Sequence, residues 1–220
     1  MKNIIIFGEN VPGYNILVLN EREVRAAAGI LFLFTYTALL LIIFKGYFPF
    51  IKYVITGFLT DFIIRVFINP KYAPTLILGR LIVKNQTPEY VGAAQKKFAW
   101  IIGVVLAATM FILMVIVNSY SPITGIVCLI CLIFLFFESV FGICLGCKFY
   151  TLFYKEKAQY CPGEICELKD RQPIQKISGS QLLILLGFIV LMVLLVVFFH
   201  EIFGIRPFDL FGLESHAAAK

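Results

Sequence analysis

Residues 98–117 read FAWIIGVVLAATMFILMVIV, an unbroken run without a charged side chain. A helix of about 20 apolar residues is long enough to cross the hydrocarbon core of a bilayer. Outward from this run, hydropathy predicts four more spans, at residues 27–44, 48–68, 122–147 and 181–203. The span at 48–68 is the weakest, because it carries Pro49, Lys52, Asp61 and Arg65. We therefore expect an all-α fold, a polytopic membrane helix bundle with about five transmembrane helices.

The overall composition agrees with a bilayer as the solvent of these helices. The chain is 60% hydrophobic and 15% charged, whereas soluble chains are roughly half apolar and a quarter charged. The formal net charge is +6. Lys and Arg gather in the cytoplasmic loops of membrane proteins, so this basic balance does not indicate nucleic-acid binding.

A shorter apolar stretch, TLILGRLIV at residues 75–83, lies between the second and third spans. It is too short to cross a bilayer, and Pro70, Pro74 and Pro88 interrupt the segment around it. Such a stretch is typical of an amphipathic helix at the membrane surface. We expect one short interfacial or re-entrant element here.

The orientation of the chain follows from its positive charges. Lys and Arg concentrate before the first span, between the second and third spans, and between the fourth and fifth spans. With five spans, these three regions share one side. The positive-inside rule then places the N-terminus in the cytoplasm and the C-terminus outside. Without the span at 48–68, the two basic loops would lie on opposite sides, which supports counting it.

Asp61, Arg65 and Glu138 lie well inside predicted spans. Asp61 and Arg65 are four residues apart on one helix face, and Glu138 lies at a comparable depth, about 14 Å from the cytoplasmic end of its span at 1.5 Å per residue. Ionisable residues inside a membrane usually pair, so the simplest arrangement has Arg65 bridging Asp61 and Glu138. This fits either a polar pocket that relays a proton or holds an anion, or a salt bridge that joins two spans.

The fourth span ends in ESVFGICLGCKFY, residues 138–150, which holds Cys144 and Cys147 in a C-x-x-C spacing. The orientation places these thiols at the cytoplasmic interface, where a permanent disulfide is not expected. Thiolates in such a pair can exchange with disulfides or persulfides. We take Cys144 and Cys147 as candidate catalytic residues, with Glu138 tuning them.

Four further cysteines lie nearby in the sequence. The sequence CPGEIC places Cys161 and Cys166 in the following loop, where four thiols could hold zinc or iron in a tetrahedral site. The candidate metal ligands are then Cys144, Cys147, Cys161 and Cys166. The wide spacing of the second pair and the lack of a nearby His weigh against this. Cys128 and Cys131, deeper in the fourth span, are interpreted as core or lipid-facing residues.

The stretches FINPKYAPTLILGRLIV, KKFAWIIGVVLA and FESVFGICLGCKFY together resemble the bacterial integral-membrane family catalogued as domain of unknown function 4395. The resemblance implies a multi-pass protein of the bacterial inner (plasma) membrane, with a family-like domain at 1–154. A Cys-containing loop at 155–178 and an additional span and tail at 179–220 lie outside it. Members are discussed beside rhodanese-type sulfurtransferases and thioredoxin-like proteins, which implies sulfur or redox chemistry with a partner of that kind.

Three functions fit these observations. The first is thiol–disulfide or persulfide chemistry at the cytoplasmic C-x-x-C. The second is a transporter or channel for a small anion, with or without sulfur, with Asp61, Arg65 and Glu138 along its path. The third is a scaffold with a structural four-thiolate metal site. The sequence requires no cofactor, and it leaves the substrate, the oligomeric state and the role of the last span open.

Overall fold

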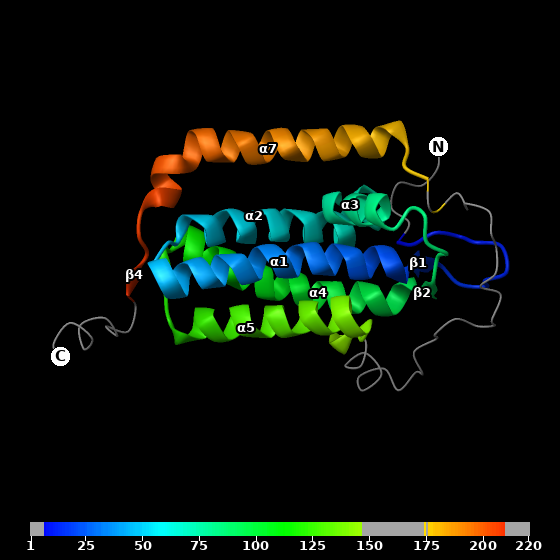
Figure 1. Ribbon diagram of the computed structural model, residues 1–220, viewed down its shortest axis with the longest axis horizontal. Coiled ribbons are helices and arrows are strands. Elements are labelled where there is room, and N and C mark those ends of the chain that lie inside the picture. The colour runs from blue at the N-terminus through cyan, green and yellow to red at the C-terminus, as the bar shows by residue number, and fades with distance from the viewer. Residues whose placement is uncertain (1–6, 147–173, 175, 210–220) are drawn as a thin grey trace.

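The computed structural model describes residues 7–146, 174 and 176–209, and they form a bundle of helices (Figure 1). In chain order the elements are β1 (Val18–Asn20), α1 (Glu21–Lys45), α2 (Pro49–Ile63), a 3-10 turn (Pro70–Tyr72), α3 (Pro74–Ile82), β2 (Tyr90–Gly92), α4 (Ala93–Phe111), β3 (Ser119–Tyr120), α5 (Pro122–Phe136), α7 (Gly179–Gly204) and β4 (Phe208–Asp209). The strands have only two or three residues each. The predicted all-α bundle is therefore confirmed.

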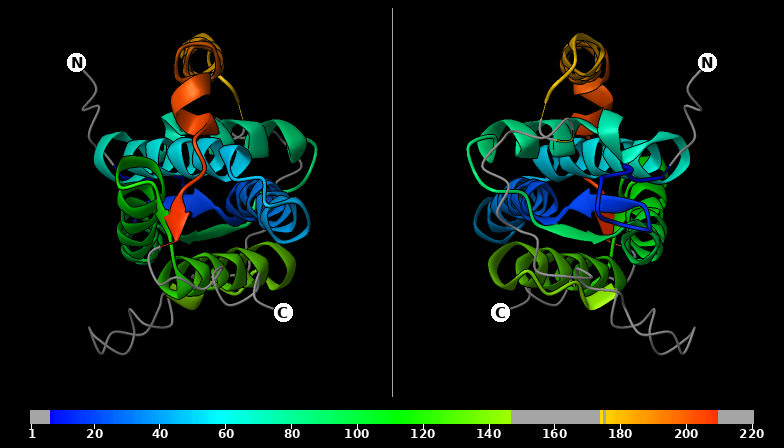
Figure 2. Two further views of the ribbon diagram at one scale, coloured as in Figure 1. Left: turned by 90° about the vertical axis from the view of Figure 1, so that its left-hand side faces the viewer. Right: turned by 90° about the vertical axis from the view of Figure 1, so that its right-hand side faces the viewer.

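Two small strand pairs mark the two ends of the bundle (Figure 1). β1 pairs antiparallel with β2, so that Val18 faces Gly92, and β3 pairs parallel with β4, so that Ser119 faces Phe208. Between these ends α1, α2, α4 and α5 run alongside one another, and α7 lies on the outer side of α2 (Figure 2). We call the two ends the β1–β2 end and the β3–β4 end.

Local sequence signals explain where these helices begin. The Asn20 side chain accepts a hydrogen bond from the backbone N–H of Arg22 at the start of α1. Ser121 and Thr124 form a capping box on α5, and Ser178 and Gln181 form one on α7. Each cap satisfies backbone N–H groups that have no partner within the helix. Proline at the first position of α2, α3 and α5 removes a further unpaired donor.

Three helices end in a wider turn. α2, α4 and α5 continue into π-helical turns at Ile64–Ile68, Ile112–Ile116 and Phe137–Phe141. Single π turns inside α-helices occur frequently at functional sites. The turn after α5 carries Glu138, and the turn after α2 carries Arg65.

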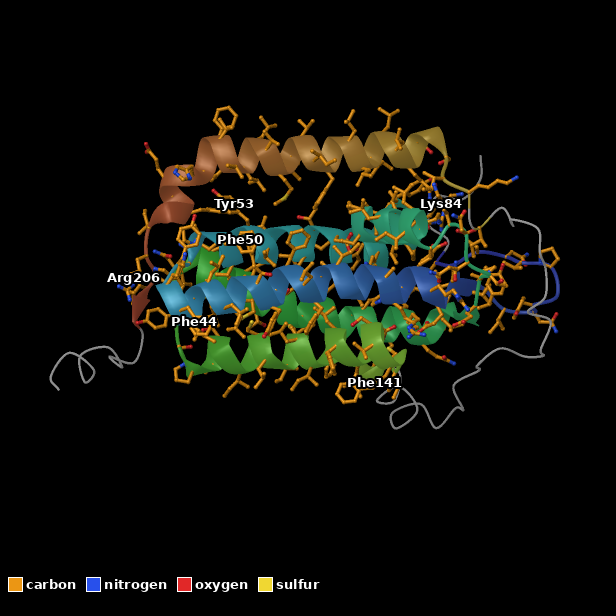
Figure 3. All side chains as sticks on the ribbon, viewed as in Figure 1. Phe44, Phe50, Tyr53, Lys84, Phe141 and Arg206 are labelled. Atoms are coloured by element: carbon orange, nitrogen blue, oxygen red, sulfur yellow. The ribbon has the colours of Figure 1, made fainter. Side chains whose placement is uncertain are left out.

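In the described part of the chain, four helices are long and apolar enough to cross a membrane: Glu21–Lys45, Ala93–Ile116, Pro122–Phe141 and Gly179–Gly204. Their outer surfaces match this, since large side chains such as Phe44, Ile112, Ile126 and Leu183 are each at least half exposed. Figure 3 shows the side chains of α7 projecting on all sides. Extended apolar surfaces of this kind mark lipid or protein contacts rather than contact with water.

The predicted span at 48–68 forms α2 and its π turn, but its composition does not place it among these four helices. Its charged side chains point inward: Lys52, Asp61 and Arg65 are each at most 2% exposed. Lys52 donates to the Asn118 side chain and to the Ile205 carbonyl at the β3–β4 end, at 2.7 Å each. α2 is thus an inner helix of the bundle.

The short apolar stretch at 75–83 forms α3, which packs against α1 at the β1–β2 end. The contact is close: a Cβ added to Gly79 would lie 2.6 Å from the carbonyl oxygen of Glu23. Only glycine permits this approach of the two backbones. Leu76, Ile77 and Arg80 on α3 are buried.

The expectation of a continuous helix across residues 122–147 is wrong at its last turn. The π turn after α5 ends at Phe141, and Gly142 adopts a left-handed backbone with φ of 66°. This conformation is disfavoured for residues with a Cβ. The guanidinium of Arg25 lies 3.3 Å from where that Cβ would be and donates to the Val140 carbonyl. The chain therefore turns at Gly142, and Cys144 does not continue the helix that carries Glu138.

Candidate functional site

Asp61 and Arg65 form a buried ion pair next to the start of α3. The Arg65 Nε donates to Asp61 Oδ2 at 2.7 Å. The same carboxylate accepts from the Thr75 backbone N–H at 2.8 Å and from the Thr75 hydroxyl at 2.7 Å. Asp61 thus caps the first turn of α3 from a different helix. The positive end of the α3 dipole stabilises its negative charge. The pair joins α2 to α3.

The Arg65 guanidinium is also enclosed by aromatic rings. Its Cζ lies 4.6 Å from the ring centroid of Phe62 and 5.0 Å from that of Trp100. A cation over an aromatic face is stabilised by the ring quadrupole, and more so where water is excluded. These contacts fix the guanidinium between α2 and α4.

Glu138 has a different partner from the one that the sequence predicted. It forms an ion pair with Lys96 of α4, and Lys96 also lies 2.8 Å from Glu21 of α1. No ion pair joins Arg65 to Glu138 within the described ranges, so the predicted bridge is wrong. Lys96 precedes the predicted span at 98–117, where a lysine is expected in a loop, whereas it lies in the first turn of α4 and is 3% exposed.

A third buried cluster lies at the β1–β2 end and was not predicted. Arg80 of α3 lies 3.0 Å from Glu23 of α1 and 3.2 Å from Glu9. Burial raises the pKa of the Glu9 carboxyl, while the charges of Arg80 and Lys71 oppose this. The sequence signal was weak, because all these residues fall outside the predicted spans. Such clusters hold α3 and the N-terminal segment against the bundle.

Arg65 and Glu138 nevertheless line one cavity, which we call the first cavity. Its volume is about 60 Å³, and Cys131 and Cys144 also line it. The remaining wall is apolar and includes Phe58, Phe62, Val24, Trp100, Leu106 and Leu135. A water needs about 10–15 Å³ of such volume, so the first cavity can hold several waters or one small solute. It brings two thiols, a carboxylate and a guanidinium to the wall of one cavity.

The turn at Gly142 places Cys144 in this wall. Beyond it, Gly146 packs against α4 so closely that a Cβ would lie 2.6 Å from the Cβ of Ala99. Cys144, Leu145 and Gly146 all line the first cavity. The two glycines of the quoted motif therefore fold its first cysteine back against the bundle.

A second cavity of about 30 Å³ lies next to the first. Cys131 and Phe58 line both cavities, and Cys128 lines the second. Cys128 is 6% exposed and belongs to an apolar cluster with Met110 and Met114. The interpretation of Cys128 as a core residue agrees with this position, whereas Cys131 lies where the two cavities meet.

The other predicted thiols lie outside the described residues. These are Cys147 of the C-x-x-C pair and both cysteines of the following loop, Cys161 and Cys166. Across residues 7–146 and 176–209, no group of three or more His, Cys, Asp and Glu side chains is arranged to hold a metal ion. The four-thiolate metal site therefore stays a prediction.

The fold and the site define a class of protein, a helical bundle of membrane type with buried ion pairs and a thiol-bearing cavity. The family model of a domain of unknown function (DUF4395) matches residues 19–155. The chain belongs to this family, and α7 lies beyond the matched region. No curated protein and no solved structure matches the chain.

Proposed function

We propose that the protein is a thiol-exchange protein of the bacterial inner membrane, with its N-terminus in the cytoplasm and its C-terminus outside. Cys144 is the reacting thiol, and Cys147 is its predicted partner. The observation that carries the proposal is the position of Cys144 in the wall of the first cavity, together with Glu138 and Arg65. A cytoplasmic thioredoxin-like or rhodanese-type protein is the proposed exchange partner.

The charges around the first cavity support a thiolate. A nearby cation favours the deprotonated form of a cysteine, which is the nucleophile in exchange. The Arg65 guanidinium is held in place by Asp61, Thr75 and two aromatic rings. A preorganised charge acts strongly on developing negative charge beside it. Arg65 therefore stabilises the Cys144 thiolate and any anionic sulfur species beside it.

Glu138 supplies a proton acceptor in the same wall. Its carboxylate is oriented by Lys96, which is itself shared with Glu21. In the proposed step, Glu138 takes the proton of the Cys144 thiol. The Cys144 sulfur then attacks one sulfur of an incoming disulfide or persulfide, forming one S–S bond as another breaks. The leaving thiolate accepts the proton from Glu138.

The test is mechanism-based trapping in membranes. Cys147→Ser should leave a mixed disulfide or persulfide at Cys144, detectable as a mass shift that reductant reverses. Cys144→Ser should abolish it, whereas Cys128→Ser, which changes a thiol deep in the apolar core, is the matched control and should retain it. If Cys144 is never modified while the chain inserts normally, the proposal is wrong.

A transporter of a small sulfur-containing anion is the second candidate, and the pair of adjoining cavities favours it. A path for an anion needs polar groups along its length. Beyond Cys131, however, the wall of the second cavity is apolar apart from Thr35 and Cys128. Uptake of labelled anion into proteoliposomes that persists in Cys144→Ser would favour transport over exchange.

A further inference from the structure

The second cavity collects sulfur atoms from two helices. Cys128 and Cys131 of α5 and Met110 of α4 all line it. The two cysteines are three residues apart, so they lie on one face of α5. Met110 is 5% exposed, and the remaining walls are Ile51, Val54, Ile55, Phe58, Ala107 and Thr35. Three sulfur-bearing side chains therefore surround a space of about 30 Å³ inside the bundle.

Thr35 is the second observation at this site. Its hydroxyl is buried without a hydrogen-bond partner within the described part of the chain, and the residue is 6% exposed. Thr37, Thr56, Thr60 and Thr109 instead donate to the carbonyl four residues earlier, as helical threonines usually do. A buried polar atom left unpaired points to a missing ligand or water. Thr35 lines the same cavity as the sulfur atoms.

We infer that the second cavity is a binding site for a soft monovalent metal ion, Cu⁺, held by Cys128, Cys131 and Met110. Thiolate and thioether ligands select Cu⁺ over harder ions, which prefer oxygen ligands. The nitrogen and oxygen ligands that zinc or iron often use do not line this cavity. The thioether ligand also explains why the site is not evident from the spacing of His, Cys, Asp and Glu alone.

The net charge of the cavity with Cu⁺ bound is compatible with its apolar wall. When Cu⁺ binds, the S–H bond of one thiol breaks, a Cu–S bond forms, and the proton leaves to solvent with no change in oxidation state. One positive ion then balances one thiolate, and the site remains neutral. A neutral site avoids the cost of burying an unpaired charge. The Thr35 hydroxyl donates a hydrogen bond to the thiolate, as outer partners of metal ligands commonly do.

The test is anaerobic titration of the full chain in detergent with Cu⁺, against the Cu⁺ chelator bicinchoninate. One ion per chain should bind in a variant whose other cysteines are removed, Cys144→Ser/Cys147→Ser/Cys161→Ser/Cys166→Ser. Adding Cys128→Ser/Cys131→Ser to that variant should abolish binding of this ion. Retained high-affinity binding in the second variant, or no binding in the first, would overturn the inference.

Three conservative variants separate a ligand role from a folding role. Met110→Leu keeps the volume but removes the thioether, so it should weaken binding, whereas Met114→Leu changes a neighbour that does not line the cavity and should not. Thr35→Val should weaken binding by about 10–100-fold, the usual effect of losing an outer partner. Equal affinities in all three variants, with unchanged elution on size exclusion, would contradict the assignment. The inference does not rest on Cys144, so Cu⁺ binding and trapping at Cys144 succeed or fail separately.

Discussion

α2 and α7 lie side by side, yet they relate to the rest of the molecule in opposite ways (Figure 1). α2 carries Lys52 and Asp61, with Arg65 in the turn that follows, and all three are almost fully buried. α7 has no charged side chain over most of its length, and only Gln181 and Phe203 are buried. Hydropathy therefore ranks α7 as the strongest span and α2 as the weakest, although α2 lies further inside.

The contrast shows what hydropathy measures in such a bundle. It reports the side chains that face lipid, whereas an inner helix can carry charge if each charge finds a partner. Asp61 has Arg65 and Thr75, and Lys52 has Asn118 and Ile205. A helix with charged residues can thus be a necessary part of a membrane bundle. The test of this view is to remove those partners.

The largest effect is expected from Arg65→Met. It leaves the Asp61 carboxylate buried without its cation, which costs about 3–5 kcal/mol when one partner of a buried pair is removed. Unfolding of the purified chain in mixed micelles would measure the loss. Asp61→Asn/Arg65→Met removes both charges and should recover part of it. If Arg65→Met alone were as stable as the original chain, the stabilising role of the Asp61–Arg65 pair would be contradicted.

Substitutions at two glycines, one packed against α2 and one on α7, should change stability by an intermediate amount. A Cβ at Gly103 of α4 would lie 2.3 Å from the Phe62 ring of α2, whereas nothing lies within 4 Å of one at Gly187 of α7. Gly103→Ala should therefore destabilise by about 1–3 kcal/mol through overpacking. Gly187→Ala should instead raise helix stability by up to about 1 kcal/mol. The same unfolding assay compares them, and equal values would argue against close packing of α2 on α4.

The smallest effect concerns Glu9, a carboxyl outside the spans. Burial raises its pKa above the ordinary value of 4.5, so the folded chain holds this proton more tightly than the unfolded chain. Its contribution to stability is complete below that ordinary value and is lost as the pH rises through the folded pKa. Glu9→Gln should flatten this part of the pH dependence of unfolding. An unchanged slope would mean that Glu9 is not buried as described.

Much of the fold could be predicted from the sequence, because apolar runs and caps are local signals. The runs at 27–44 and 181–203 lie within observed helices, and the run at 98–117 is helical up to Ile116. The burial of Asp61 with Arg65 also followed from their spacing on one face. The residues around Glu138 and Cys144 carry the resemblance to the family whose model matches residues 19–155.

The candidate site was harder to predict, because it depends on contacts between segments distant in sequence. Lys96 reaches Glu138 across 42 residues, and a lysine next to a predicted span looks like a loop residue. Gly142 ends the helix through a left-handed backbone, which hydropathy does not detect. Without that turn, Cys144 is placed on the wrong face, and its approach to the cavity shared with Cys131 is missed.

The partners of α2 also constrain the order in which the protein can be completed during synthesis. Asp61 finds Thr75 only 14 residues later in the chain, so this carboxylate can be capped soon after α2 leaves the ribosome. Lys52 depends on Asn118 and on Ile205, which lie 66 and 153 residues later. The ammonium at the other end of the same helix therefore has its full set of partners only after α7 has been made. The last contact of α2 to form during synthesis is therefore one made by Lys52, near the start of that helix.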